Sequence, residues 1–168
     1  MPDATLRYIC DLDDKRLASM KAQVQPDYVT NDFEGMISDP DLDAVVIATN
    51  GPTHFDLCQR ALLSGKDVYV EKPFVLSVAE AEQLVALAES HGRILMVGHL
   101  LEYHPVVTRL KEMISGGDLG EIRYIYSQRL NLGTVRVDEN ALWNFAPHDI
   151  SIILFLLGMT PTDVSARG

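Results

Sequence analysis

Two segments of the sequence carry side chains that could act together on an alcohol. Lys72 stands in the tripeptide Glu71-Lys72-Pro73, directly after the apolar run 67–70. An ammonium group at the end of a buried strand needs a partner or a ligand, and its charge can lower the pKa of a bound substrate hydroxyl. His148 stands in the segment LWNFAPHDI, where a neutral imidazole near a helix start can act as a general base. The pair predicts proton removal from a hydroxyl, with Lys72 and His148 as the catalytic residues.

Each feature also has a plainer interpretation. Glu71-Lys72-Pro73 alone would fit a surface salt bridge, and a lone histidine is more often a core or capping residue than a base. A further hypothesis is a metal enzyme that uses His99, Glu102 and His104. The spacing of these two histidines would not align them on a helix, and no second ligand cluster supports them, so we expect no metal site.

Residues after two other apolar runs indicate a cofactor. Asp11 stands near the end of the run 6–12, and an acid at the end of the second Rossmann strand accepts hydrogen bonds from an adenosine ribose and repels a 2′-phosphate. Asp11 therefore favours NAD over NADP, although Asp11 or Asp13 could instead cap the next helix. Thr49, Asn50 and His54 follow the β-branched run 44–49, which is typical of a strand covered on both faces. They stand where a turn and a helix start could offer N–H groups to a cofactor, or form a plain Thr-capped turn.

The order of the expected elements predicts an α/β fold. Strands at 6–12, 28–30, 44–49, 67–70 and 94–97 alternate with helices, which is typical of a doubly wound parallel sheet. No G-x-G-x-x-G turn occurs anywhere in the chain. We therefore expect residues 1–98 to form a partial Rossmann domain that lacks the first strand and the glycine-rich loop. The missing strand would lie between the strands that end near Asp11 and begin at Ala44.

The pattern changes in the last third of the sequence. We expect an amphipathic helix at 105–114, a half-exposed strand at 121–130, a helix at 150–157 and the beginning of a strand at 164–166. These elements predict that residues 99–168 are the incomplete start of an α+β substrate domain.

Composition and charge exclude several classes of function. Hydrophobic residues make up 47% of the chain and charged residues 23%, so a disordered protein is not expected. The net charge of −10 argues against a nucleic-acid partner. Apolar runs are too short to span a bilayer, and Met1-Pro2-Asp3 does not open an export signal. With only Cys10 and Cys58 as thiols, we expect a cytoplasmic protein without disulfides.

Taken together, these residues resemble the Gfo/Idh/MocA family of oxidoreductases. The resemblance runs along nearly the whole chain, in order, through Asp11, Ala48-Thr49-Asn50, His54, Glu71-Lys72-Pro73, Gly98-His99, Tyr103-His104-Pro105, the segment 117–122 and His148-Asp149-Ile150. It implies a longer, two-domain NAD(P)-dependent dehydrogenase that acts on a sugar alcohol and forms a homo-oligomer. The stretch WNFAPHD looks most like members that act on nucleotide-linked amino sugars.

The resemblance also implies roles for individual residues. It places the nicotinamide and the substrate hydroxyl at Lys72 and the proton acceptor at His148. Many members carry an aspartate one helical turn before that histidine, where this sequence has Asn144, and an amide cannot relay a proton. The implied cofactor contacts come from Asp11, Thr49, Asn50, His54, Glu71, Lys72 and Pro73, and the implied substrate contacts from Tyr103, Asn144 and His148. The alternative function is a non-catalytic fragment or interaction module that binds no dinucleotide.

Overall fold

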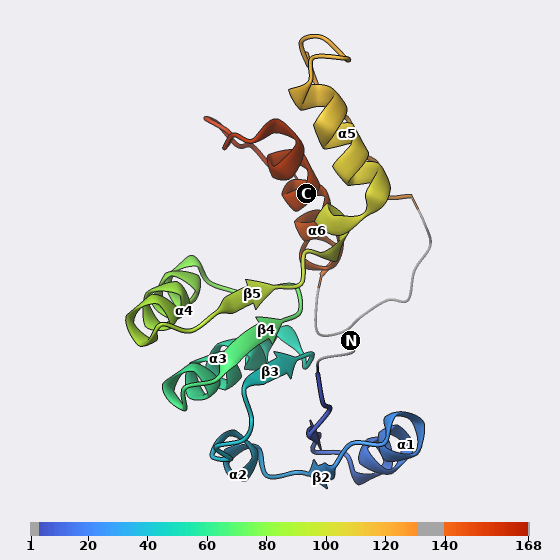
Figure 1. Ribbon diagram of the computed structural model, residues 1–168. Coiled ribbons are helices and arrows are strands. Elements are labelled where there is room, and N and C mark those ends of the chain that lie inside the picture. The colour runs from blue at the N-terminus through green and yellow to red at the C-terminus, as the bar shows by residue number, and fades with distance from the viewer. Residues whose placement is uncertain (1–3, 131–139, 168) are drawn as a thin grey trace.

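The apolar runs near the N-terminus form a strand–helix–strand unit. The computed structural model describes residues 4–130 and 140–167 (Figure 1). The unit consists of β1 (Tyr8–Cys10), α1 (Asp14–Val24) and β2 (Tyr28–Thr30). The two strands pair in parallel. Asp13 begins α1, because its carboxylate accepts the N–H group of Lys15 and so satisfies a free donor of the first turn.

The central sheet holds the main core. Its strands are parallel, in the order β3 (Ala44–Ile47), β4 (Asp67–Val70) and β5 (Leu95–Val97). The connecting elements are the short η1 (Gly51–Thr53), α3 (His54–Leu63) and α4 (Val78–His91). The largest fully buried side chains include Leu62 of α3, Leu84 of α4 and Val68 and Val70 of β4, so the two helices pack onto the sheet through one apolar layer.

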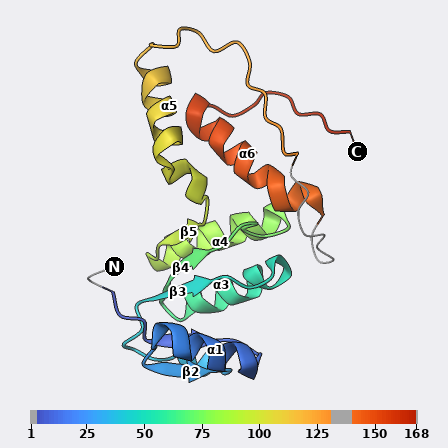
Figure 2. The ribbon, with the colours of Figure 1, turned by 90° about the vertical axis from the view of Figure 1, so that its right-hand side faces the viewer.

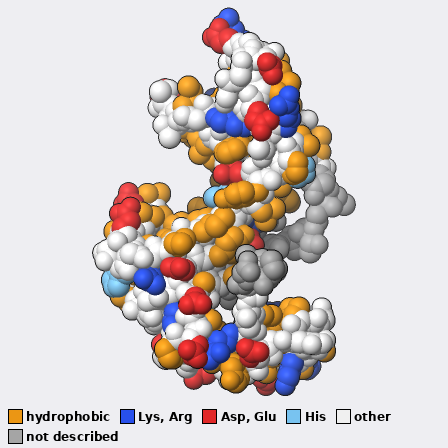
Figure 3. Space-filling model, viewed as in Figure 1, with side chains coloured by type: hydrophobic (Ala, Val, Ile, Leu, Met, Phe, Trp, Pro, Cys, Tyr) orange, Lys and Arg blue, Asp and Glu red, His pale blue; other side chains and the backbone are white. Residues whose placement is uncertain are grey.

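Only one face of the central sheet is covered in the part of the chain that the structure describes. α3 and α4 pack on each other and on the same face (Figures 1 and 2). Val45 and Ile47 of β3 point into that layer and are buried, whereas Val46 points the other way and is 71% exposed. Figure 3 shows apolar side chains gathered over the open face of β3, β4 and β5. The prediction that residues 44–49 are covered on both faces was therefore wrong, because none of the described helices packs on the second face.

The two sheets are joined by side chains. Within the described residues, β1 forms no ladder with β3, and the short α2 (Phe33–Ile37) carries the chain from one sheet to the other. Asp39, in the turn after α2, accepts hydrogen bonds from Arg7 Nε at 2.8 Å and from Tyr8 Oη at 2.7 Å. Arg7, and after it Tyr8, hold the pKa of Asp39 well below its usual range. Lys66 Nζ donates to the Asp39 carbonyl at 2.6 Å, so this residue connects the N-terminal unit with the start of β4.

The C-terminal part consists of helices. η2 (Leu100–Tyr103) follows β5 and leads into α5 (Pro105–Ser115), which lies beside the long α6 (Ala141–Leu157) in Figure 2. Lys111 of α5 donates to the Leu156 carbonyl of α6 at 3.1 Å. Among the helices that the structure describes, none is both long and apolar enough to cross a membrane.

Three sequence predictions for this part were wrong. Residues 121–130 are extended but form no strand, because no neighbouring strand offers a ladder in the described chain; Tyr124 is 84% exposed. Residues 164–166 likewise form no strand. The last helix begins at Ala141 rather than at Ile150, since Asn140 caps it by accepting the Trp143 N–H group. His148 therefore lies inside the helix.

Replacement of Asp39 tests the link between the two sheets. We expect Asp39→Asn to lower the melting temperature by a few degrees at neutral pH, because Arg7 and Tyr8 lose a charged acceptor. Since the folded-state pKa of Asp39 is lowered, its contribution is present above the ordinary aspartate value of about 4 and is lost as the pH falls below it. The difference between the wild type and the variant, measured by thermal unfolding, should thus shrink in acid.

Asp41→Asn is the matched control. Asp41 also binds Arg7, but its side chain is 74% exposed against 13% for Asp39, so solvent screens that pair. Equal losses in the two variants would contradict the special role of Asp39.

Candidate active site

Lys72 lies where the central sheet meets α6. It follows β4, at the carboxyl edge of the parallel strands, where open α/β sheets bind their ligands. Lys72 Nζ donates to the backbone oxygen and to the side-chain Oδ1 of Asn144, both at 3.1 Å. An ammonium group has three donors, so one remains available. The structure thus brings together Lys72 and the segment that contains His148, although they are far apart in the sequence.

The carbonyl that Lys72 contacts stands next to one that Pro147 leaves without an intrahelical donor. A proline inside a helix has no N–H group, so the carbonyl four residues earlier, that of Trp143, loses its intrahelical donor. The next carbonyl, that of Asn144, accepts from Lys72. Asn144 and His148 are one turn apart and therefore share a face of α6. This face is turned toward the end of β4.

His148 has an environment that suits a base. Its Nδ1 atom is buried and has no hydrogen-bond partner among the described residues. Burial lowers the pKa of His148, and the positive charges of Lys72 and Arg129 and the nearby His99 lower it further, against an opposing effect of Asp149. A lowered pKa keeps the imidazole neutral, and a neutral imidazole can accept a proton.

His99 is a further member of this group, to which the sequence analysis gave no catalytic or binding role beyond that of a possible metal ligand. Val70 of β4 pairs with Val97 of β5, so two residues further on Lys72 and His99 leave neighbouring strands at matching positions. The Nδ1 atom of His99 is buried and, like that of His148, has no partner within the described residues. The matching positions of Lys72 and His99 after adjacent apolar runs were the signal that could have identified it. No group of three or more potential metal ligands is found in the described chain.

Glu71 packs against the end of β5. Its N–H group donates to the Ile47 carbonyl at 2.9 Å, which extends the contact of β4 with β3. A Cβ atom on Gly98 would lie 2.8 Å from Tyr69 Oη and 3.1 Å from Glu71 Oε2. A side chain at position 98 would thus have to displace the ends of these two side chains. Within the described residues no ion pair joins Glu71 to Lys72, so the carboxylate does not neutralise the ammonium directly.

His54 connects two of the predicted cofactor segments. Its side chain is fully buried, with Nδ1 2.8 Å from the Pro73 carbonyl oxygen and Nε2 3.0 Å from the Thr49 carbonyl oxygen. Both ring nitrogens therefore face backbone. The imidazole holds the turn after β3 beside the Lys72–Pro73 segment, while Thr49 and Asn50 remain exposed at that turn.

Two other predicted residues lie outside this group. Asp11 follows β1 in the separate N-terminal sheet, where its Oδ1 accepts the Asp13 N–H group at 2.8 Å. Asp13, not Asp11, caps α1, which decides between the two capping interpretations. Tyr103 is 69% exposed on η2. The structure shows no hydrogen bond from Tyr103 to Lys72 or His148 in the described part of the chain.

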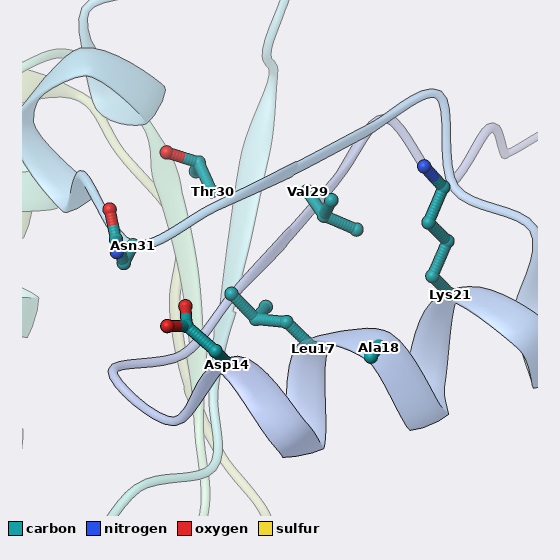
Figure 4. A pocket seen from close by; sticks show the side chains of 7 residues that line it. All are labelled: Asp14, Leu17, Ala18, Lys21, Val29, Thr30 and Asn31. Atoms are coloured by element: carbon teal, nitrogen blue, oxygen red, sulfur yellow. The ribbon is translucent and has the colours of Figure 1, made fainter.

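One surface hollow is separate from these residues. It has a volume of about 450 Å³ and lies between α1 and the strand β2 (Figure 4). Its lining is Asp14, Leu17, Ala18, Lys21, Val29, Thr30 and Asn31. None of the predicted catalytic, cofactor or substrate residues lines it. We place the candidate active site at Lys72 and His148, because these titratable groups lie close together and could transfer a proton. An open hollow alone offers no such pair of groups.

Comparison with known proteins places the chain in a family. The Gfo/Idh/MocA model, described as an oxidoreductase family with an NAD-binding Rossmann fold, matches residues 1–99. UDP-N-acetylglucosamine 3-dehydrogenase of Acidithiobacillus ferrooxidans is 33% identical over 129 residues, which cover 76% of this chain and 40% of the relative. The uncharacterized oxidoreductase YrbE of Bacillus subtilis is 25% identical across 100% of this chain and 51% of its own length.

A solved structure agrees with these relatives. The crystal structure of an NAD binding oxidoreductase from Klebsiella pneumoniae superposes with a TM-score of 0.76 at 25% identity, over 94% of this chain and 46% of that one. The chain spans about half or less of the length of the curated relatives it matches. The matched residues contain the parallel strands and the Glu71-Lys72-Pro73 motif, and the chain belongs to the Gfo/Idh/MocA family of NAD-binding oxidoreductases.

Proposed function

We propose that this chain carries the catalytic residues of an NAD(P)-dependent dehydrogenase that oxidises a secondary alcohol of a sugar. The observation that carries the proposal is the pair of hydrogen bonds from Lys72 Nζ to Asn144, one turn before His148. These bonds hold an ammonium donor beside an imidazole whose lowered pKa favours its neutral form. A donor and a proton acceptor on one hydroxyl are what alcohol oxidation requires of a protein.

Lys72 would orient and polarise the alcohol. Two of its three N–H donors are directed to the Asn144 oxygens, which leaves one for the substrate hydroxyl. Charge next to the oxygen lowers the pKa of the hydroxyl and favours the alkoxide character that develops as the C–H bond breaks. Asn144 supports this role as an acceptor, because its amide oxygen fixes the ammonium without taking the proton.

His148 would take the hydroxyl proton. Its position on the same face as Asn144 turns it toward the end of β4, and burial keeps its imidazole neutral. His99, at the end of β5, would contribute a second imidazole to the substrate side of the site. The unpartnered Nδ1 atoms of His99 and His148 support a polar ligand here, since buried polar groups are normally hydrogen-bonded.

The residues present fit the ribose and nicotinamide ends of a dinucleotide. Thr49 and Asn50 are exposed at the end of β3, next to the Lys72–Pro73 segment to which His54 ties them. Asp11 offers a carboxylate at the end of β1, in the position that suits a ribose. A bound nicotinamide would supply the hydride acceptor of the reaction. His54 and Pro73 would act through the backbone rather than by direct contact.

The relatives support a proposal for the substrate class. One of them is named UDP-N-acetylglucosamine 3-dehydrogenase. By extension, this chain would act on a sugar and, more narrowly, on a nucleotide-linked amino sugar. Residues 1–98 would serve the cofactor, and residues 99–168 would begin the substrate domain of a cytoplasmic homo-oligomer. Tyr103 on η2 would meet the substrate from that side.

Replacement of Lys72 tests the central role. We expect Lys72→Ala in the full-length protein to lower kcat by about 10²–10⁴-fold, the usual range for a positioned electrostatic or acid–base group. Asn144→Ala should cost less, because the backbone oxygen still accepts from Lys72. The measurement is NADH formation from candidate sugars. Lys15→Ala, on the exposed side of α1, is the control, and near-normal turnover of Lys72→Ala would refute the role.

Binding of the cofactor tests the dinucleotide edge. Titration with NADH and NADPH, followed by nicotinamide fluorescence, should give tighter binding of NADH, because Asp11 repels a 2′-phosphate. Asp11→Ser should reduce that preference by about tenfold, equivalent to about 1.4 kcal/mol. Asp14→Ser is the matched control in the first turn of α1. Failure of the full-length protein to bind either dinucleotide would support the alternative of a non-catalytic module.

A further inference from the structure

A second polar cluster lies next to His148 on α6. Asp149 accepts hydrogen bonds from two side chains of the extended segment 121–130. Ser127 Oγ donates to Asp149 Oδ1 at 2.9 Å, and Arg129 donates from Nε to Oδ2 at 3.0 Å and from Nη2 to Oδ1 at 3.2 Å. The two parallel N–H···O bonds are the fork geometry in which an arginine fixes a carboxylate most firmly.

The cluster attaches one face of α6 to a segment that has no ladder of its own. Successive residues of a helix point about 100° apart, so Asp149 is directed away from the face that carries Asn144 and His148. Lys72 holds that second face through Asn144. Two attachments on different faces prevent rotation of the helix about its axis. The direction in which His148 points therefore depends on both.

The side chain of Asp149 is 22% exposed and that of Arg129 35%, so the pair is partly shielded from solvent. An exposed pair of this kind would have little effect at a distance. This pair, however, stands beside a half-buried imidazole whose Nδ1 atom has no hydrogen-bond partner in the described chain. The positive charge of Arg129 therefore lowers the pKa of His148, and the negative charge of Asp149 raises it.

We propose that Arg129 and Asp149 are positioning residues for His148, whose ion pair fixes the rotation of α6 and holds two opposite charges beside the imidazole. The inference rests on the proposed role of His148 as the base. The ion pair lies outside the group of residues that would touch substrate or cofactor.

The charged and titratable groups around His148 give the proposal a definite sign. Lys72 from the end of β4, His99 from the end of β5 and Arg129 from the segment 121–130 disfavour the imidazolium, after burial itself, whereas Asp149 favours it. Removal of the Arg129 charge should raise the pKa of His148, because Asp149 is then uncompensated. Removal of the Asp149 charge should lower that pKa, because Arg129 is then uncompensated. A role limited to structure predicts the same direction for both, since both break the same ion pair.

The test is a titration of the histidine imidazoles by NMR in the full-length protein, with His148→Gln to assign the signal of His148. We expect the midpoint to move to higher pH in Arg129→Gln and to lower pH in Asp149→Asn, with the double variant between them. Arg109→Gln, which breaks the exposed pair of Arg109 with Glu112 on α5, should leave the midpoint unchanged. Shifts in one direction in both single variants, or none in either, would overturn the proposal.

Arg129→Lys separates charge from geometry. It keeps the cation but loses the fork, so the midpoint should stay near that of the wild type while kcat falls and KM changes little. Ser127→Ala, a milder change, keeps the test possible should Asp149→Asn not fold, and it should lower kcat in the same manner by loosening Asp149. Unchanged kcat in both of these folded variants would also count against positioning.

The acid limb of kcat/KM should follow the NMR midpoint in each variant. Opposite NMR shifts in a protein without dehydrogenase activity would refute the proposed function and leave the charge balance intact. Dehydrogenase activity whose acid limb is the same in Arg129→Gln, Asp149→Asn and the wild type would refute the charge balance and leave the proposed function intact.

Discussion

The hydrogen bonds of Lys72 to Asn144 are the constraint on which the candidate site depends. A half-buried ammonium needs acceptors in place of water, because an unpaired charge away from solvent is costly. Asn144 provides two oxygens at 3.1 Å, one from the backbone and one from the side chain. These contacts connect the end of β4 with α6, two elements that the sequence separates widely. Because His148 lies one turn further along α6, the requirement of Lys72 for acceptors is also what brings the imidazole to the sheet.

The parallel register supplies the rest of the arrangement. β3, β4 and β5 end at one edge, so the residues that follow them, Thr49, Lys72 and His99, leave the sheet at the same edge. His54 holds the first of these turns to the second through two carbonyl contacts. The N-terminal unit with Asp11 is attached differently, through Asp39. The turns after β3 and β4 are therefore held together by one buried side chain that contacts backbone oxygens, whereas the position of Asp11 depends on contacts between side chains.

The sequence predicted the elements well where a local pattern determines them. Short β-branched runs became β3 and β4, and Gly92, with φ of 60°, ends α4 where a left-handed residue is required. The strand at 121–130 failed because alternation alone forms no strand without a partner. His54 was assigned to a cofactor since its position in the turn was visible in the sequence, but its burial against two carbonyls was not. The chemistry of Lys72 and His148 and the family resemblance suggested that the two act together, but no local rule brings together residues so far apart in the sequence.

Asn144 explains why burial and charge act together at His148. An aspartate at this position would bring a negative charge next to Lys72 and offset its field, whereas the neutral amide binds the ammonium and leaves its charge in place. The positive charge of Lys72 is accordingly, after burial, the next largest cause of the lowered pKa of His148. With Asn144, the site loses a carboxylate that could share the proton, but it keeps the imidazole neutral by electrostatics instead. In this arrangement a base needs no relay partner, provided that the charge next to it is held at a fixed distance, which is the task that the two Asn144 oxygens perform.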